Sequence, residues 1–300
     1  MPLIGFEELY RHADTLSKPV PVAVAGAQDL TVLRALRTAT DRGWIRPILV
    51  GDPQLIKEVA ASEAILLEGF DFVQAAGDQI AMVAVNEVKV GRASLLMKGQ
   101  ISTPILMHAV LDAATGLRTG RVVAQIVLME LPGRDRRFLL ADTGITIAPK
   151  LRSKIDILME SVQVAQALDC KEPRVAMLAA TEVANTQMPE TFDALELTQR
   201  NQAGEFPGCV IQGPLSFDLA FTTDAGLKKR VGGKVVGAAD IMIFPNLLSA
   251  NLTVKAIMYT AECRFGGVLR GTTHPVVFMS RSDDVPTRLN SLALALRLIG

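Results

Sequence analysis

A hydroxyl, a guanidinium and the start of a helix meet at Ser280 and Arg281. The preceding run, residues 274–279, is almost wholly apolar and is typical of a short buried strand. Pro286, shortly after the pair, predicts the start of a terminal helix. Open α/β sheets bind ligands at the carboxyl ends of their strands, and these groups suit a phosphate or an acyl oxyanion. The pair therefore predicts an anion site.

A second strand end carries a lysine. The apolar run 94–97 is followed by Lys98 and Gly99, and then by Thr103 and Pro104, which predict the N-cap and first position of a helix. A lysine, a glycine-bearing loop and helix amides can hold an anion. The alternative is an ordinary strand-to-helix turn with an exposed lysine. The spacing of a P-loop is absent from the sequence.

Two aspartates are candidates for acid–base chemistry. Asp142 directly follows an apolar run, so it is either a general base or a turn-forming residue. Asp218 lies at the start of a predicted helix and either faces a cleft or is a capping or solvated aspartate. Sequence alone leaves both alternatives open.

A small-polar segment follows the predicted strand 241–244. It begins at Pro245 and Asn246, and a small-polar loop of this kind, entering a helix, could line a cofactor groove. The candidate substrate-binding residues of the chain are Lys98, Gly99, Ser102, Thr103, Asn246 and Asn251. No Gly-x-Gly-x-x-Gly follows a strand, and no His/Cys/Asp spacing resembles a metal site, so we expect neither a Rossmann dinucleotide site nor a metal.

The amino-acid composition excludes some classes of protein for this chain. The chain has 300 residues, 49% of them hydrophobic and 21% charged, as expected for a protein with a large core. Lys+Arg and Asp+Glu both total 31, which argues against general nucleic-acid binding. Three dispersed cysteines favour reduced thiols in a cytoplasm. The weakly charged stretch 235–254 is interrupted by polar residues and proline, and the N-terminus lacks a signal-peptide pattern, so no membrane association is expected.

Short apolar runs alternate with segments of helical period, which indicates an α/β fold with a largely parallel sheet. The expected strands are 21–25, 47–50, 94–97, 122–129, 138–141, 174–178, 241–244 and 275–279. Helical spacing is clearest over 30–42 and 151–168. The strands 122–129 and 138–141 flank a turn-rich polar link and predict an antiparallel hairpin, where the chain could pass into a second domain.

Taken together, these stretches resemble the phosphate acetyltransferase/phosphate butyryltransferase family. The chain carries, in family order, VAVAGAQD with RPILVGDP, LLMKGQIST, GLRTGR, FLLADTGITIAPKLRSKIDIL, PRVAMLAATE, IQGPLSFDLA, AADIMIFPNLLSAN and HPVVFMSRSDD. The LLMKGQIST and GLRTGR stretches look closer to the butyryl branch. The resemblance implies two α/β/α domains of related topology flanking a cleft, similar to isocitrate dehydrogenase. The last strand and helix would return to the first domain, giving residues 1–130 plus 275–300 and residues 131–274.

The resemblance also implies an activity. Family members are usually homo-oligomers, often dimers, and convert acyl-CoA and phosphate into acyl phosphate and CoA, with CoA as a substrate and no bound cofactor. Arg281 would bind the phosphate or acyl phosphate, and Ser280 would hydrogen-bond the acyl oxyanion. Both substrates would meet in one ternary complex, without an acyl-serine. Two other functions stay open, namely an oxidoreductase on the same fold and a non-catalytic protein that binds CoA or acyl phosphate.

One position departs from the family pattern. Acetyl-transferring relatives carry an aspartate about two helical turns beyond the Ser-Arg pair, proposed to deprotonate the CoA thiol, and Thr287 stands at the matching position here. The base is then one of four carboxylates, or CoA ionises without one. The four candidates are Asp142, Asp218, Asp283 and Asp284.

Overall fold

The chain folds into two compact units. The computed structural model describes residues 2–299. The N-terminal unit comprises Phe6–Arg121 and the residues from Phe265 onward, and the middle unit comprises Val122–Arg264 with the residues before Phe6. The C-terminal strand and helix therefore belong to the unit that the N-terminal half of the chain builds.

The boundaries of these units differ from those expected at residues 130 and 274. The hairpin strands β5 (Ala124–Leu131) and β6 (Arg136–Ala141) pair antiparallel, so a boundary at residue 130 would separate bonded neighbours. Strand β10 (Arg264–Arg270) pairs antiparallel with β11 (Val276–Val277), which draws residues 265–274 into the N-terminal unit.

The sheet of the N-terminal unit has the strand order β3-β2-β1-β4-β11-β10. Its further strands are β1 (Val20–Ala25), β2 (Ile45–Gly51), β3 (Asp71–Gln74) and β4 (Leu95–Lys98). All neighbours pair in parallel except β10 with β11. In β1, β4 and β11 nearly every residue is buried, because helices cover both faces of the sheet.

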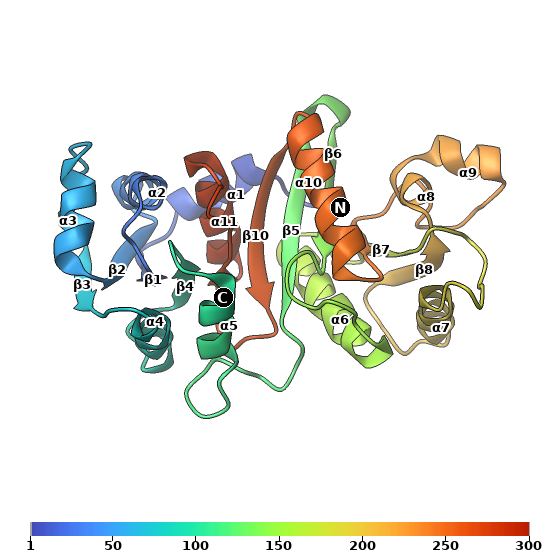
Figure 1. The fold of residues 1–300 in the computed structure, drawn as a ribbon. Coiled ribbons are helices and arrows are strands. Elements are labelled where there is room, and N and C mark those ends of the chain that lie inside the picture. Colours follow the sequence, from blue (N-terminus) through green and yellow to red (C-terminus); the bar gives the residue numbers. More distant parts are fainter. Residues whose placement is uncertain (1, 300) are drawn as a thin grey trace. The chain divides into compact units, whose positions relative to one another are not determined.

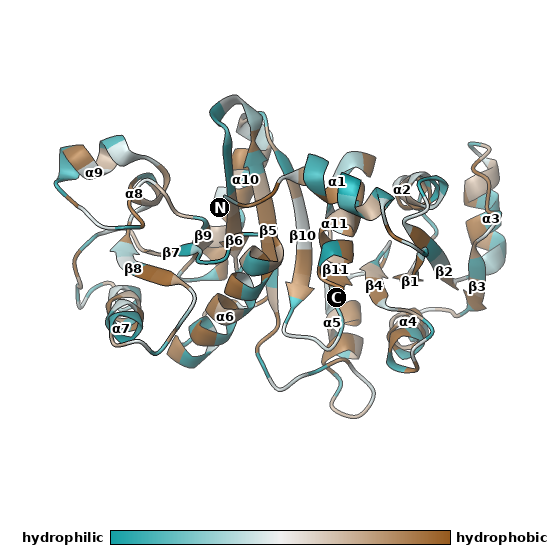
Figure 2. Ribbon diagram, turned by 180° about the vertical axis from the view of Figure 1, so that it is seen from behind, coloured by the Kyte–Doolittle hydropathy of each residue, from teal (hydrophilic) through white to brown (hydrophobic). Residues whose placement is uncertain are grey.

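The helices of this unit form two layers. Helices α1, α2 and α11 lie above the strands in Figure 1, and α4 and α5 lie below them. The same layers are seen from behind in Figure 2, where β4 is coloured as hydrophobic. The helix bounds are α1 (Phe6–Asp14), α2 (Leu30–Asp41), α3 (Pro53–Ala61), α4 (Gln79–Lys89), α5 (Thr103–Leu111) and α11 (Val285–Arg297).

The middle unit has the strand order β5-β6-β9-β7-β8. Strands β7 (Arg174–Leu178), β8 (Val210–Leu215) and β9 (Ile241–Ile243) run parallel to β6, and the predicted hairpin β5–β6 is confirmed. Helices α6 and α7 lie below these strands in Figure 1, α8 lies above β7 and β8, and α10 lies in front of β6. The helix bounds are α6 (Leu151–Ala167), α7 (Glu190–Gln202), α8 (Phe217–Phe221), α9 (Thr223–Lys229) and α10 (Leu247–Thr260), with a short 3₁₀ turn at Pro132–Arg134.

The α/β class and the largely parallel pairing are thus confirmed. Three strands were not predicted, namely β3, β8 and β10. Within residues 2–299, every helix is too short or too polar to cross a membrane.

Candidate functional site

Lys98 lies at the carboxyl end of β4 and is buried. Its side chain is only 2% exposed, which excludes the exposed-lysine alternative. Burial, with help from the charges of Arg281 and Arg288, lowers the pKa of Lys98 to about 8, and Asp283 opposes this shift. Its Nζ has one hydrogen bond in the described part of the chain, to the carbonyl oxygen of Gly99 at 3.4 Å. A buried ammonium of this kind is suited to bind an anion.

The backbone beside Lys98 is unusually close to the end of β1. Gly99 donates its N–H to the carbonyl of Ala25 at 2.9 Å, and Gln100 donates to the carbonyl of Gly26 at 2.6 Å. Gly26 has a φ of +76°, a conformation that favours glycine. The two strand ends are therefore joined at the edge where ligands bind in this class of sheet.

Ser280 and Arg281 follow β11, the neighbour of β4, and both are exposed. The loop is held by its own polar groups. The N–H of Ser280 donates to Asp283 Oδ2 at 2.9 Å, and the hydroxyls of Ser280 and Ser282 lie 2.9 Å apart. The predicted pair is thus presented on an ordered turn at a strand end.

A residue that the sequence reasoning missed lies behind this turn. Arg288, on α11, is 1% exposed. Its Nε donates to Thr31 Oγ1 at 3.1 Å and its Nη2 donates to the carbonyl of Ser280 at 3.5 Å. Burial lowers its pKa, against the charges of Asp29, Asp283 and Asp284. The available signal was an arginine directly before the largely apolar run LNSLALAL of a terminal helix.

Helices α5 and α11 begin near the site, and the N-cap of α5 differs from the expected residue, whereas Pro286 opens α11 as expected. Ser102, not Thr103, is the N-cap of α5, and its Oγ accepts from the N–H of Ile105 at 3.5 Å. At α11, Asp284 caps the helix by accepting from the N–H of Thr287 at 2.9 Å. Thr287, which stands where acetyl-transferring relatives carry an aspartate, lies in the first turn of α11 and is buried.

Asp142, in the middle unit, is buried and its carboxylate organises a loop. It accepts from the N–H groups of Gln125 at 3.0 Å, Gly144 at 3.0 Å, Ile145 at 3.2 Å and Thr146 at 2.7 Å. Burial raises the pKa of Asp142, and these hydrogen bonds oppose that rise. The contacts match the turn-forming alternative, because they occupy both carboxylate oxygens.

Asp218 begins α8 and is exposed. Its carboxylate contacts Lys229 Nζ at 3.1 Å, and the same ammonium also binds Glu182 at 2.8 Å. The Ser216 hydroxyl and Lys229 hold the pKa of Asp218 below its usual value. The geometry is that of a solvated aspartate in a surface ion-pair network.

Asn246 is the N-cap of helix α10 and Asn251 lies within that helix. Asn246 caps the helix, with its Oδ1 accepting from the N–H of Ser249 at 2.9 Å. Asn251 lies in the second turn, where its Nδ2 donates to the carbonyl of Thr143 at 3.4 Å. The α10 start and the Asp142 loop are thereby connected within the middle unit.

The expected residues therefore fall into two groups. The N-terminal unit contains Ser280, Arg281, Lys98, Gly99, Ser102 and Thr103, and the middle unit contains Asp142, Asp218, Asn246 and Asn251.

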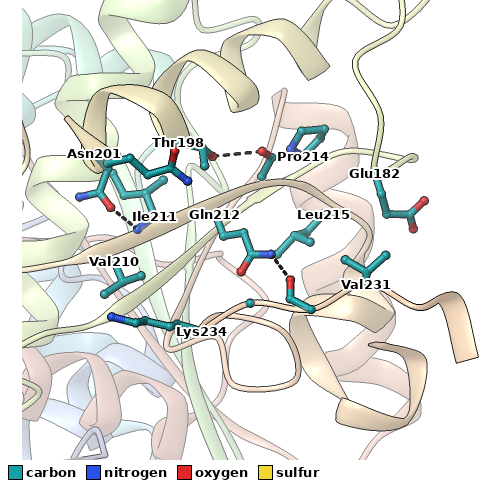
Figure 3. A pocket seen from close by; sticks show the side chains of 14 residues that line it. Glu182, Thr198, Asn201, Val210, Ile211, Gln212, Pro214, Leu215, Val231 and Lys234 are labelled. Carbon is teal, nitrogen blue, oxygen red and sulfur yellow. Dashed lines mark hydrogen bonds between the residues drawn. The ribbon is translucent and has the colours of Figure 1, made fainter. Parts of the chain in front are cut away.

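A separate pocket of about 640 Å³ lies against β8 in the middle unit, between α7 and residues 231–234 (Figure 3). Gln212 closes one side by donating to the carbonyl of Gly232 at 2.8 Å, and Thr198 donates to the carbonyl of Gly213 at 3.0 Å. None of the expected site residues lines this pocket.

Known proteins match the chain over nearly its whole length. The family model described as "Phosphate acetyl/butaryl transferase" matches residues 73–296. A phosphate butyryltransferase of Clostridium acetobutylicum is 39% identical over 280 residues, which cover 93% of each chain. A phosphate acetyltransferase of Thermotoga maritima is 34% identical over 274 residues, 91% of this chain and 93% of the relative.

The solved structures agree. A branched-chain phosphotransacylase from Enterococcus faecalis V583 superposes with a TM-score of 0.82 and 29% identity, covering 93% of this chain and 99% of the other. Together with the sequence matches and the Ser280-Arg281 strand end, this similarity identifies the protein: the chain belongs to the phosphate acetyl/butyryl transferase family, a family of phosphate acyltransferases.

Proposed function

We propose that the protein catalyses acyl-CoA + phosphate ⇌ acyl phosphate + CoA by direct transfer in a ternary complex. One observation carries the proposal, namely that the predicted Ser-Arg pair lies on the same strand-end edge as the buried cation Lys98, with Arg288 behind it. That group of cations provides the charge that a phosphate dianion needs.

Arg281 binds the attacking phosphate in this mechanism. A phosphate oxygen attacks the thioester carbonyl carbon, and the carbonyl electrons move onto oxygen. The Ser280 hydroxyl donates to that oxyanion and stabilises the tetrahedral intermediate. Its collapse breaks the C–S bond and releases CoA as a thiolate, which then takes a proton from solvent or from an acid.

The remaining binding residues complete the proposal. Gly99 lets the backbone beside Lys98 pack closely against Gly26, and Ser102 and Thr103 begin α5 just beyond. Asn246 and Asn251 are proposed as substrate contacts of the middle unit. The assignment of a base to Asp142 or Asp218 stays a prediction, and their observed contacts support structural roles at least as well.

Finer features follow from the family resemblance and are part of the same proposal. They are an isocitrate-dehydrogenase-like arrangement of two α/β units flanking a cleft, a homodimer, and a cytoplasmic location that the free thiols favour. CoA acts as a substrate rather than as a bound cofactor. The higher identity to the butyryltransferase favours acyl groups longer than acetyl.

The test is phosphate-dependent thiol release across acetyl- to octanoyl-CoA, measured with the wild-type protein and with Arg281→Ala. We expect release with the wild type and a loss of about 100-fold or more in kcat/KM with the variant. Thiol release that is absent for every acyl-CoA would contradict the proposal. Binding of CoA without turnover would instead identify a non-catalytic binding protein.

A further inference from the structure

Lys98 and Arg288 are two buried cations without a direct contact to a carboxylate in the described residues, although Asp29, Asp283 and Asp284 act on Arg288 and Asp283 acts on Lys98 through longer-range charge interactions. They are 2% and 1% exposed, and in residues 2–299 neither forms an ion pair. Their hydrogen bonds go to neutral oxygens, those of Gly99, Thr31 and Ser280. A buried charge is costly unless it is paired, so this arrangement points to an anion that arrives with the substrate.

The charged surroundings of Lys98 support this reading. Arg281, Arg288 and Asp283 act on it directly. The neighbouring strands β1 and β11 contain no charged residue. Helix α4, which packs on β4, carries Glu87 and Lys89, but Glu87 pairs with Arg92, and Lys89 donates to the carbonyl of Ala114. Among the charged groups that act on Lys98 itself, the two arginines therefore outnumber the one carboxylate, that of Asp283.

We propose that Lys98 is a direct ligand of the phosphate substrate, alongside Arg281, and that Arg288 is a positioning residue that donates to the Ser280 carbonyl and adds positive charge near Lys98. This inference rests on the proposed function, because it names the residues that bind one of the two substrates.

A pH dependence follows from the position of Lys98. In the free protein the pKa of Lys98 is about 8, so the ammonium is protonated below that pH and loses its charge above it. A bound dianion favours the protonated form, and affinity for the dianion therefore falls as the pH rises through the pKa. Sulfate is the appropriate probe, because its charge stays constant over this range while that of phosphate changes.

The experiment is calorimetric titration of the whole protein with sulfate from about pH 6 to about pH 10. For the wild type we expect a constant Kd below about pH 8 and an increase of about tenfold per pH unit above it. Lys98→Met should raise the Kd at pH 7 by about 10- to 100-fold. It should also remove the break in the profile, that is, the pH at which the Kd begins to rise. Lys98→Arg should keep tight binding with a flat profile, because guanidinium stays protonated. Lys18→Met, at the exposed amino end of β1, is the matched control and should behave as the wild type.

The effect of Arg288 on Lys98 is tested by the pH at which the sulfate Kd begins to rise. Because the Arg288 charge lowers the pKa of Lys98, Arg288→Met should move the break to higher pH, which a purely structural role would not do. If this variant fails to fold, Arg288→Gln provides the same test, since its amide removes the charge and can still donate to the carbonyl of Ser280.

Two outcomes would overturn the inference. A wild-type break that persists in Lys98→Arg shows that another group titrates. A Lys98→Met variant with unchanged sulfate affinity and a raised KM for acyl-CoA assigns the cation to the phosphates of CoA. Sulfate binding needs no turnover, so these results remain informative even if the protein released no thiol from acyl-CoA.

Discussion

A Cβ atom on Gly99 would lie 2.1 Å from the carbonyl oxygen of Gly26, so the backbones of the two residues approach as closely as glycine allows. Real Cβ atoms are essentially never found this close to another atom, and here the obstacle is backbone that cannot rotate away. The contact fixes the separation between the ends of β1 and β4, beside Lys98.

Gly99→Ala should therefore destabilise the protein by about 1–3 kcal/mol. The free energy of unfolding in urea measures this, and phosphate-dependent thiol release should fall with it. The matched control is Gly133→Ala, at a position where nothing lies within 4 Å of the new methyl group. Equal stabilities of the two variants would mean that the β1 and β4 ends separate easily.

Ser280→Ala should lower kcat by about 10²- to 10³-fold, since it removes one donor to the oxyanion. The KM for phosphate should change little, because the charged ligands stay in place. Initial rates of thiol release at varied phosphate concentration separate the two constants. Ser17→Ala, at an exposed site before β1, provides the control. A change in KM alone would assign Ser280 to substrate binding instead.

Asp142→Asn should lower the free energy of unfolding by about 1–3 kcal/mol, because an amide cannot accept at both positions that the carboxylate fills. Its NH₂ group would face a backbone N–H such as that of Thr146 or Gly144. Asp218→Asn should change stability by at most about 1 kcal/mol, since its ion pair with Lys229 is exposed.

Urea unfolding and kcat measured on both aspartate variants also locate the base. A large loss of kcat with unchanged stability identifies the base at that position. A stable Asp142→Asn protein would show instead that Asp142 is protonated in the folded state, the direction in which burial shifts its pKa.

Asn246→Ala should cost about 1 kcal/mol of stability through the lost cap of α10, whereas Asn246→Asp keeps an acceptor for the N–H of Ser249. Thermal unfolding measures the cap. If Asn246 also contacts substrate through its amide N–H, Asn246→Asp raises the KM for acyl-CoA while stability is retained. Normal kinetics of Asn246→Asp would limit Asn246 to the cap.

The predicted strands share one physical property, continuous burial. Strand β7 was predicted with its observed bounds, and its residues after Arg174 are buried. The missed strands lack this signal. Strand β3 lies at the edge of its sheet and is only half-buried, β8 contains Gly213-Pro214, and β10 contains Gly266-Gly267. In a sequence, glycine and proline indicate turns, and only the pairing of the segment with neighbouring strands shows that it is a strand.

The candidate site, like the strands, was predicted where a local sequence pattern marks it. Ser280, Arg281 and Lys98 were identified because each follows an apolar run, a local pattern. The burial of Lys98 and the contact between Arg288 and the Ser280 carbonyl depend on how α11 packs against α2 and β11. No sequence spacing reports packing of that kind, so Arg288 could be found only in the structure.

The short strand β11 has a consequence for the biosynthesis of the protein. It inserts between β4 and β10, and it is synthesised after every other described strand of this sheet. Until it emerges, the sheet of the N-terminal unit has an open slot, although most of its strands were synthesised long before. The middle unit is complete by then and can fold first. A nascent chain that stalls before residue 276 therefore exposes the unpaired edge of β4, a target for chaperones and proteases.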